Sequence, residues 1–403
     1  MQNHRHKAIF SIIFTVCLVV PFSIDIFISG LPEIGQHFPG ANISLLLSVA
    51  LFGFALAQPF YGPLLDRFGR RPVLLAGLWI YTLASAQVML ANSFELLIIG
   101  RFIQTLGACS ATISIYAIAR DSYTEERLLR VMSSIMALMG ISPAIAPLLG
   151  SLLNAEWGWR ASFIFLFVMG CFFTVFVQFF FKETLTNKNR EALTVKNIIM
   201  TYANLARNSK FLMYCVISGF SYSVLFSYFN LSPLFIIEQM HFSLISYGII
   251  VAMNALAIVA TTILIPMLAK KFSLLHIMRA GLMVILIGGV FMGLINVYLK
   301  PNLYTFMLPM GLTTTGIGMI RGTASASAMQ LAAKQIAGSA AAFFNFITFV
   351  SGAFATIVTA RLIHQIPGFG LFISLMALAG LGMMLLNKGR KPIASSAIEP
   401  GGE

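Results

Sequence analysis

Charged side chains are scarce in this sequence. Of its 403 residues, only 10% are Asp, Glu, Lys or Arg, and 58% belong to the apolar and aromatic set AVILMFWYC. An ordinary globular protein has about 25% charged residues, so this chain lacks the charge that a water-soluble surface needs. The composition therefore excludes a soluble enzyme and indicates a membrane protein.

Cysteine and catalytic motifs are also sparse. The four cysteines, Cys17, Cys109, Cys171 and Cys215, lie inside apolar runs without a CxxC pair, so neither a disulfide framework nor a metal site is expected. The six histidines lie in tails, loops and turns, away from any buried acid or nucleophile, and no GxxxxGK[ST] loop is present. We expect no enzyme activity, no cofactor and no direct use of ATP, which leaves an ion gradient as the energy source.

Twelve apolar stretches are long enough to cross a bilayer, which takes about 20 residues at a rise of 1.5 Å each. The expected spans are 8–30, 43–61, 73–92, 96–118, 131–153, 162–181, 211–236, 244–267, 276–299, 303–328, 336–360 and 367–387. The predicted fold class is an all-α membrane protein with twelve transmembrane helices in two six-helix bundles.

The basic residues indicate how these spans are oriented. With the N-terminus in the cytoplasm, most of the 26 Lys and Arg residues fall in cytoplasmic segments, and only Arg160, Lys300 and Arg361 fall on the other side. This bias predicts that both termini are cytoplasmic, and it explains the net charge of +13 without nucleic-acid binding. The largest polar break predicts a bundle over 1–181, a cytoplasmic linker over 182–210 and a second bundle over 211–403. Within the linker, Val195 to Leu205 fits either an interfacial amphipathic helix or a solvated segment.

The loop after the second span carries the most specific motif. It reads GPLLDRFGRRP over residues 62–72 and resembles the signature loop of the major facilitator superfamily. The resemblance implies that the loop acid and a following arginine pair with charges at the end of the fourth span and form a gating latch. The expected latch residues are Gly62, Asp66, Arg67, Gly69, Arg70, Arg71, Arg120 and Asp121. The alternative is a basic turn that only enforces topology.

Two further motifs narrow the resemblance. Arg101, Gln104 and Gly107 match an RxxQxxG element of proton-coupled members, and Pro143, Pro147 and Gly150 resemble the antiporter motif. With Gly158-Trp159-Arg160 and Glu183-Thr184-Leu185, these motifs resemble in order the Bcr/CflA-like branch of drug:proton antiporters. The branch usually has Pro at +4 and +7 after its first-span Asp, whereas Asp25 is followed by Ser29 and Pro32. The motif prolines also fit a simple packing kink.

Ionisable residues inside the membrane are functional candidates, because an unpaired charge there is costly. Asp25 is the only acid well inside a span, and its estimated depth matches that of Arg101. We predict that Asp25 carries a proton, that Arg101 tunes its affinity, and that Gln104 extends the polar wall. The alternative is a static ion pair that locks two helices together.

Arg321 has no acid in its own span and is a candidate for an anionic substrate group, although it also fits snorkelling toward the cytoplasm. Polar and aromatic residues elsewhere in the spans are candidates for lining a substrate cavity, with interhelical hydrogen bonds or core packing as the alternatives. The expected cavity residues are Tyr116, Phe226, Tyr228, Asn230, Arg321 and Asn345.

The sequence thus predicts a proton-driven antiporter of the bacterial inner membrane that exports small amphipathic molecules, as in multidrug efflux and antibiotic resistance. Its expected partners are a small-molecule substrate, protons and the lipid bilayer, and we expect a monomer that binds no nucleic acid. One alternative is an exporter of a single endogenous anionic metabolite such as a siderophore. Another is a membrane sensor or scaffold that transports nothing.

Overall fold

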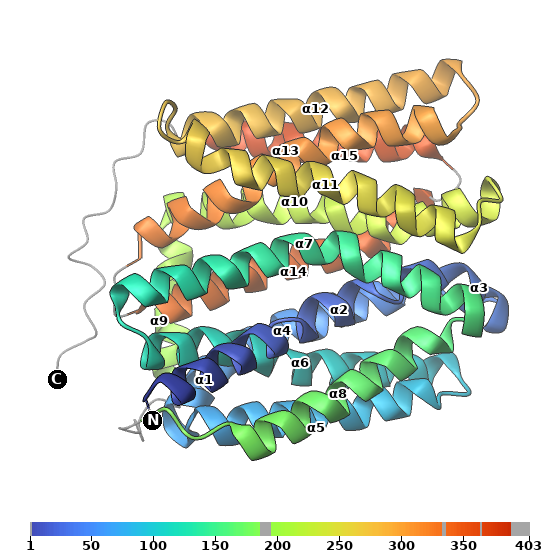
Figure 1. The fold of residues 1–403 in the computed structure, drawn as a ribbon. Helices are drawn as coiled ribbons and strands as arrows, with labels where there is room; N and C mark the ends of the chain where they lie inside the picture. Colours follow the sequence, from blue (N-terminus) through green and yellow to red (C-terminus); the bar gives the residue numbers. More distant parts are fainter. Residues whose placement is uncertain (1, 186–194, 333–335, 363–364, 388–403) are drawn as a thin grey trace. The chain divides into compact units, whose positions relative to one another are not determined.

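A computed structural model describes residues 2–185, 195–332, 336–362 and 365–387, which form helices joined by short turns (Figure 1). The bounds are α1 (Gln2–Val16), α2 (Val19–Asp25), η1 (Ile28–Gly30), α3 (Leu31–His37), α4 (Ser44–Phe68), α5 (Arg70–Met89), α6 (Phe94–Ser122), α7 (Glu125–Trp157), α8 (Arg160–Phe180), α9 (Val195–Arg207), α10 (Ser209–Pro233), η2 (Leu234–Gln239), α11 (Leu244–Leu268), α12 (Leu274–Tyr298), α13 (Leu303–Gln330), α14 (Ala337–Thr359), η4 (Ala360–Leu362) and α15 (Ile366–Leu386).

Twelve helical segments among the described residues are long and apolar enough to cross a membrane, as the sequence predicted. The first of them runs over Ile9–His37 and therefore extends past the expected end at residue 30. It is longer because the chain becomes helical again after an interruption, where Pro32 stands at the start of α3. Proline is tolerated in the first turn of a helix, whose N–H groups have no partner within the helix.

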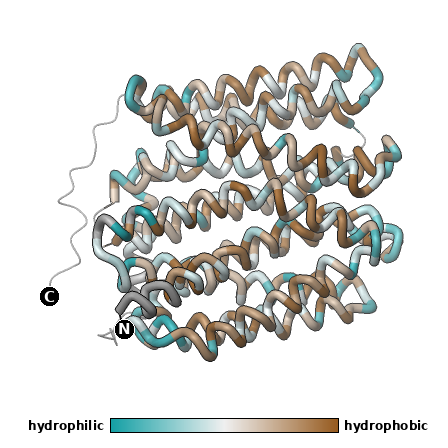
Figure 2. Tube along the Cα trace, viewed as in Figure 1, coloured by the Kyte–Doolittle hydropathy of each residue, from teal (hydrophilic) through white to brown (hydrophobic). Residues whose placement is uncertain are grey.

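Large apolar side chains are exposed along the helices. On α8, Phe172 is 57% exposed, Phe179 is 77% exposed and Phe180 is 62% exposed. Hydrophilic residues gather instead at the helix ends and turns (Figure 2). Apolar surface on this scale is stable only where hydrocarbon replaces water, so the chain is a multi-pass membrane protein.

Small residues bring neighbouring helices into close contact. Between α5 and α6, a Cβ on Gly107 would lie 2.6 Å from the carbonyl oxygen of Gly77. Between α12 and α13, a Cβ on Gly316 would lie 2.5 Å from the carbonyl oxygen of Gly281. In lipid, helices associate through such close backbone packing rather than through exclusion of water.

The chain forms two compact units. The first comprises Met1–Leu193 and Phe229–Leu256, and the second comprises Thr194–Tyr228 and Ala257–Glu403. Apart from the boundary after Leu193, the units meet in the chain near the end of α10 and in the middle of α11. The division of the chain into two bundles at a 182–210 linker stays a prediction from the sequence.

The amphipathic segment within the expected linker is helical. It forms α9, where Tyr202 stacks on Phe343 of α14 with 5.6 Å between ring centroids and Leu205 is buried. Residues 186–194 of the expected linker and the basic C-terminal tail lie outside the described residues. The location of α9 at a membrane surface stays a prediction.

Candidate functional site

The first membrane span is interrupted twice, at Cys17–Leu18 between α1 and α2 and at Ile26–Phe27 after α2, and the second break carries the polar contacts described here. The helix α2 ends at Asp25, and helical structure resumes with η1 at Ile28. An interruption leaves backbone carbonyl groups without their usual partners four residues later. Two of these carbonyls accept hydrogen bonds from side chains of other helices: Ser23 O accepts from Arg101 Nη2 at 2.9 Å, and Ile26 O accepts from Ser162 Oγ at 3.2 Å.

Arg101, on α6, is the largest side chain that is fully buried. Its Nη1 donates to Gln104 Oε1 at 2.6 Å, and Gln104 Nε2 donates to Ser85 Oγ at 2.7 Å. The guanidinium carbon lies 4.1 Å from the ring centroid of Phe27, which places the charge against an aromatic face. The Nε–H group has no hydrogen-bond partner in the described structure. Arg101 is therefore held by uncharged groups in a nearly dry site.

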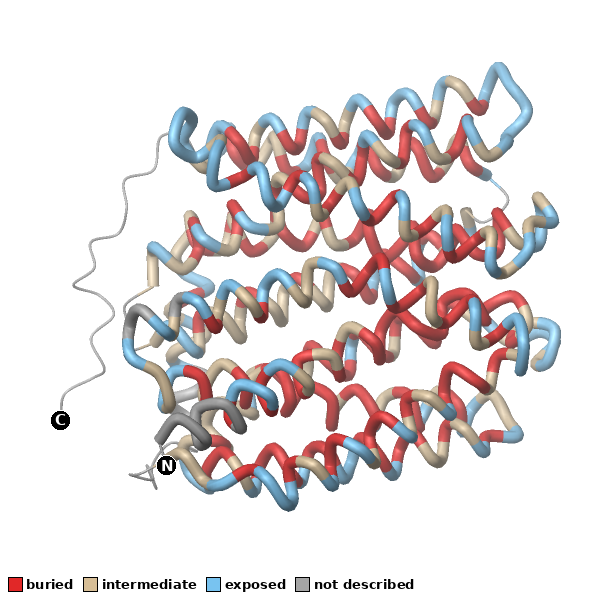
Figure 3. The backbone as a smooth tube through the Cα atoms, viewed as in Figure 1, coloured by how far each residue is buried: buried red, intermediate tan, exposed pale blue. Residues whose placement is uncertain are grey.

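The surroundings of Arg101 extend the polar cluster to α5. Ser23 Oγ lies 3.0 Å from the hydroxyl of Tyr81, which is itself fully buried. All residues of α2 except Pro21 are buried, as the burial colours along the backbone in Figure 3 illustrate. The sequence identified Arg101 and Gln104, but not the uncharged residues around them: Ser23 and Ser85, which bond to them, and Tyr81, which contacts Ser23.

Asp25 is 5% exposed and lies two residues after Ser23, at the end of α2. Of the described residues, Ser23 and Gln104 accept the hydrogen bonds of Arg101, so the structure does not pair Arg101 with Asp25. The guanidinium instead reaches the carbonyl that the helix interruption exposes. The role of Asp25 as a proton carrier stays a prediction.

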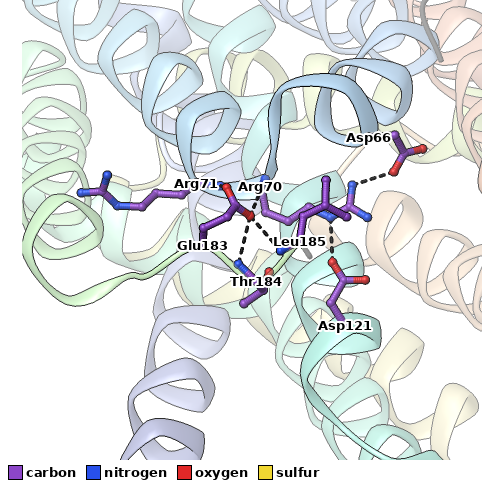
Figure 4. A network of polar contacts seen from close by, with 7 residues as sticks. All are labelled: Asp66, Arg70, Arg71, Asp121, Glu183, Thr184 and Leu185. Carbon is purple, nitrogen blue, oxygen red and sulfur yellow. Dashed lines mark hydrogen bonds and ion pairs between the residues drawn. The ribbon is translucent and has the colours of Figure 1, made fainter. Parts of the chain in front are cut away.

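A charge cluster joins the loop between α4 and α5 to the end of α6 (Figure 4). Arg70 lies between two acids: its Nη1 contacts Asp66 Oδ1 at 2.7 Å, and its Nε contacts Asp121 Oδ2 at 2.8 Å. Arg70 is only 2% exposed, so its charge depends on these partners. The structure therefore brings Asp66, Arg70 and Asp121 together, and the action of this cluster as a gating latch stays a prediction.

Other residues expected in the latch lie outside this cluster. Arg120 is exposed, and Arg67 lies 5.4 Å from the ring centroid of the neighbouring Phe68. A Cβ on Gly62 would meet no atom within 4 Å. Arg71 points the other way, toward the end of α8, where its Nε donates to Phe181 O at 2.7 Å.

Glu183, just after α8, caps the start of α5. Its Oε1 accepts from the backbone N–H of Arg70 at 3.0 Å, and its Oε2 accepts from the N–H of Arg71 at 3.1 Å. The N–H groups of Thr184 and Leu185 also donate to Oε1, each at 2.9 Å. Burial opposes ionisation, but these four backbone hydrogen bonds outweigh it and lower the pKa of Glu183 below its usual range. An ionised carboxylate at this position also complements the positive end of the α5 dipole.

Gly69 makes this cap possible. It is the single residue between α4 and α5, and its φ of 109° lies in a region that favours glycine. A Cβ at this position would lie 2.5 Å from Glu183 Oε2. Glycine is thus required both by the turn and by the approach of the carboxylate.

The antiporter-like motif lies on α7. Pro143 and Pro147 are both inside the helix, where each removes one backbone hydrogen bond, and Ser151 Oγ donates to the carbonyl of Pro147 at 2.8 Å. Gly150 packs directly against the carbonyl of Ile26 at the interruption of the first span. The motif is therefore in contact with the segment that carries Asp25.

Arg321, on α13, lies in an aromatic environment in the second unit. Its Nε donates to the hydroxyl of Tyr222 at 3.1 Å, and its guanidinium carbon lies 5.1 Å from the Tyr222 ring centroid. The Tyr222 ring lies 5.7 Å from that of Phe226 and 5.8 Å from that of Phe349. No acidic side chain among the described residues forms an ion pair with Arg321.

The other cavity candidates make contacts of their own. Tyr228 is fully buried and stacks on Phe306 at 6.1 Å, while the Asn230 amide donates to Ser44 Oγ at 2.9 Å. The Tyr116 hydroxyl lies 3.6 Å from the sulfur of Met139, and Asn345 is half-buried on α14. Asn230 thus makes the interhelical hydrogen bond that was the alternative to cavity lining. Within the part of the chain that the structure describes, no three His, Cys, Asp or Glu side chains are grouped as metal ligands.

Twelve candidate spans, an interrupted first span and a charge cluster at the helix ends are features of secondary transporters. The chain belongs to the Major Facilitator Superfamily, whose sequence profile matches residues 13–356. This match confirms the family inferred from the signature loop, and it makes the chain a transporter rather than an enzyme.

Similar proteins support this assignment. The chain is 29% identical over 376 residues to the multidrug resistance protein MdtL of Klebsiella pneumoniae subsp. pneumoniae, covering 92% of this chain and 88% of that relative. It is 32% identical over 244 residues to a multidrug resistance protein MdtL of Escherichia coli O45:K1, covering 60% of this chain and 61% of the relative. The crystal structure of a D-xylose-proton symporter has the same fold, with a TM-score of 0.73 and 15% identity over 94% of this chain and 97% of that one.

Proposed function

We propose that this chain is a proton-driven antiporter that exports small amphipathic molecules, including drugs, across the inner membrane of a bacterium. The multidrug resistance proteins to which it is similar support the substrate class. The observation that carries the coupling mechanism is the fully buried Arg101, held against the interruption of the span that contains Asp25. A buried charge beside a broken membrane helix is a feature of ion-coupled sites.

In this mechanism Asp25 is the residue that gains and loses the proton. Protonated Asp25 is neutral and is stable in a buried site, whereas ionised Asp25 needs water or polar or positively charged neighbours. Binding of the substrate and binding of the proton then favour different conformations of the interrupted segment, so each lowers the affinity for the other. Arg101 is the tuning residue, because its contacts are with the backbone of the same segment.

The latch contributes the conformational switch. Arg70 holds Asp66 and Asp121 together in the described state, and separating α4 from α6 at this end requires breaking at least one of these ion pairs. Such contacts form in one state and break in the other. Broken pairs become hydrated when that end of the protein opens.

Substrate-triggered proton release from purified protein tests the coupling. We expect the wild type to release protons when a drug binds, and Asp25→Asn to bind the drug without releasing any. Glu95→Gln is the matched control, because it removes an exposed carboxylate of the same unit. Undiminished release by Asp25→Asn would remove Asp25 from the mechanism. Misfolding of Asp25→Asn with rescue on neutralising Arg101 would indicate a structural role instead.

The proposal includes the membrane orientation. Both termini and the 182–210 segment lie in the cytoplasm, and the protein works as a monomer. Cysteine substitution on a cysteine-free background tests the orientation. We expect an impermeant reagent added outside intact cells to label Lys300→Cys and not Lys196→Cys, and the reverse result would overturn the topology.

A second candidate function is export of one endogenous anionic metabolite. It is favoured by Arg321, whose Nε is engaged by Tyr222 within an aromatic cluster that suits a ring-containing anion. We expect Arg321→Gln to weaken binding of carboxylate-bearing ligands more than that of neutral ones, with exposed Lys270→Gln as the control. An equal loss for both ligand classes would assign Arg321 a structural role.

A further inference from the structure

Gly150, on α7, lies against the backbone of the first span at its interruption after Asp25. A Cβ on Gly150 would overlap the carbonyl oxygen of Ile26, and it would lie 2.8 Å from the carbonyl carbon and 3.2 Å from Ile26 Cγ1. The obstacle is mainly backbone, which cannot swing away as a side chain does. The backbones of α7 and of the interrupted segment are therefore in direct contact at this point.

Two other groups hold the same segment. The hydroxyl of Ser162, on α8, lies 3.2 Å from the Ile26 carbonyl oxygen and 2.8 Å from Asn154 Oδ1. Asn154, one turn beyond Gly150 on α7, donates through Nδ2 to Ser29 Oγ at 3.0 Å. The segment after Asp25 is thus fixed at its start by Gly150 and Ser162 and at its end by Asn154.

The fixed segment carries the contacts of Arg101. Ser23 supplies the carbonyl that accepts from Arg101, and Phe27 supplies the aromatic ring beneath the guanidinium. Asp25 lies between these two residues in the chain. A shift of Ile26 away from α7 would move the acceptor, the ring and the carboxylate together relative to Arg101.

We propose that Gly150 is a positioning residue for proton coupling: by having no side chain, it lets α7 seat the interrupted segment so that Ser23 meets Arg101. This inference rests on the proposed function, in which Asp25 carries the proton. A motif glycine that serves only to bend α7 would have no such effect on residues 23–27.

The same contact links α7 to the coupling site during transport. Pro143 and Pro147 weaken the backbone hydrogen bonding of α7 just before Gly150, so this part of the helix bends more readily than an uninterrupted one. Because Gly150 touches backbone, bending of α7 moves the Asp25 segment as well. Movement of α7 and the environment of the proton carrier are thereby coupled without a charged contact between them.

Gly150→Ala tests the inference, and Gly140→Ala is its matched control. Gly140 lies on the same helix, and a Cβ there would meet no atom within 4 Å. Amide hydrogen exchange over residues 24–30 reports the seating of the segment, and substrate-triggered proton release across a pH series reports coupling. We expect Gly150→Ala to exchange about tenfold faster over 24–30, the effect of losing roughly one hydrogen bond, and to release fewer protons while still binding drug. Gly140→Ala should match the wild type in both measurements.

A second pair of variants covers the case in which Gly150→Ala does not fold. Ser162→Ala removes the hydroxyl at the Ile26 carbonyl without adding bulk and should also speed exchange over 24–30. Ile26→Ala in the Gly150→Ala background should give no rescue, because the obstructing atom is the carbonyl oxygen. Wild-type exchange in both Gly150→Ala and Ser162→Ala, or rescue by Ile26→Ala, would overturn the inference. Proton release that persists in Asp25→Asn would instead refute the proposed function and leave the exchange result standing.

Discussion

The two acids that contact Arg70 differ in exposure, and this difference predicts unequal contributions to the latch. The side chain of Asp66 is 47% exposed, that of Asp121 is 17% exposed, and that of Arg70 is 3% exposed. Water and salt screen the more exposed pair, so the contact of Arg70 with Asp121 should dominate.

The expected magnitudes follow from these exposures. An ion pair with a half-exposed partner contributes about 0.2–1 kcal/mol. A hydrogen bond to a charged group that is mostly buried contributes about 1.5–3 kcal/mol. The coupling energy between Arg70 and Asp121 should therefore exceed that between Arg70 and Asp66 by about 1–2 kcal/mol, a factor of roughly 5–30 in an equilibrium constant.

Double-mutant cycles measure both couplings. Asp66→Asn, Asp121→Asn and Arg70→Gln, singly and in pairs, are compared by reversible unfolding in mixed detergent micelles. Added salt should weaken the Asp66 coupling more than the Asp121 coupling, and both asparagine variants should reduce transport. A coupling to Asp66 that equals or exceeds the coupling to Asp121 would refute the reasoning.

Three further outcomes are expected. Because the pKa of Glu183 is lowered in the folded state, its ionised carboxylate stabilises the fold at pH values above the usual pKa of Glu, and this contribution is lost as the pH falls through the folded-state pKa. In Glu183→Gln, the free energy of unfolding should therefore decrease less steeply with falling pH in the acid range than it does in the wild type. Arg101→Lys should lower uphill export about tenfold or more in a vesicle assay, because one ammonium cannot bridge the two acceptors that the guanidinium reaches. Gly69→Ala should lower the unfolding free energy by about 1–3 kcal/mol, whereas Gly62→Ala, with open space around it, should leave the unfolding midpoint near that of the wild type.

The sequence allowed the number of spans to be predicted because hydropathy over about 20 residues is a strong signal. The interruption after Asp25 was not predicted. The expected end of the span at residue 30 also lies before His37, where the helical segment ends, because helical structure resumes after the interruption. Pro21 is the one break signal in the 8–30 stretch, and it fits the break between α1 and α2, because it cannot donate to the Cys17 carbonyl, rather than the break after Asp25. The break is stabilised by Arg101, Ser162 and Gly150, which come from three other helices.

In the latch, too, some contacts could be expected from the sequence and others could not. The resemblance of the signature loop placed Asp66, Arg70 and Asp121 among eight expected latch residues, without indicating which arginine contacts the acids. Glu183 was noted only as part of a short motif, and its capping of α5 depends on residues 112 positions apart in the chain. A carboxylate just after a span is a common feature of loops, so no local pattern distinguishes this one.

Both groups of polar contacts in the first unit include hydrogen bonds between a side chain and the backbone of another helix, beside their contacts between side chains. Arg101 reaches the carbonyl of Ser23, Arg71 reaches that of Phe181, and Glu183 receives backbone N–H groups at the start of α5. Backbone groups are available for such contacts only at helix ends and interruptions, which move as rigid pieces with their helices. In a contact of this kind only one partner can change rotamer, so it follows a sliding helix over a shorter distance than a contact between two long side chains and breaks sooner. Interfaces built this way have discrete states, which is the property that alternating access requires.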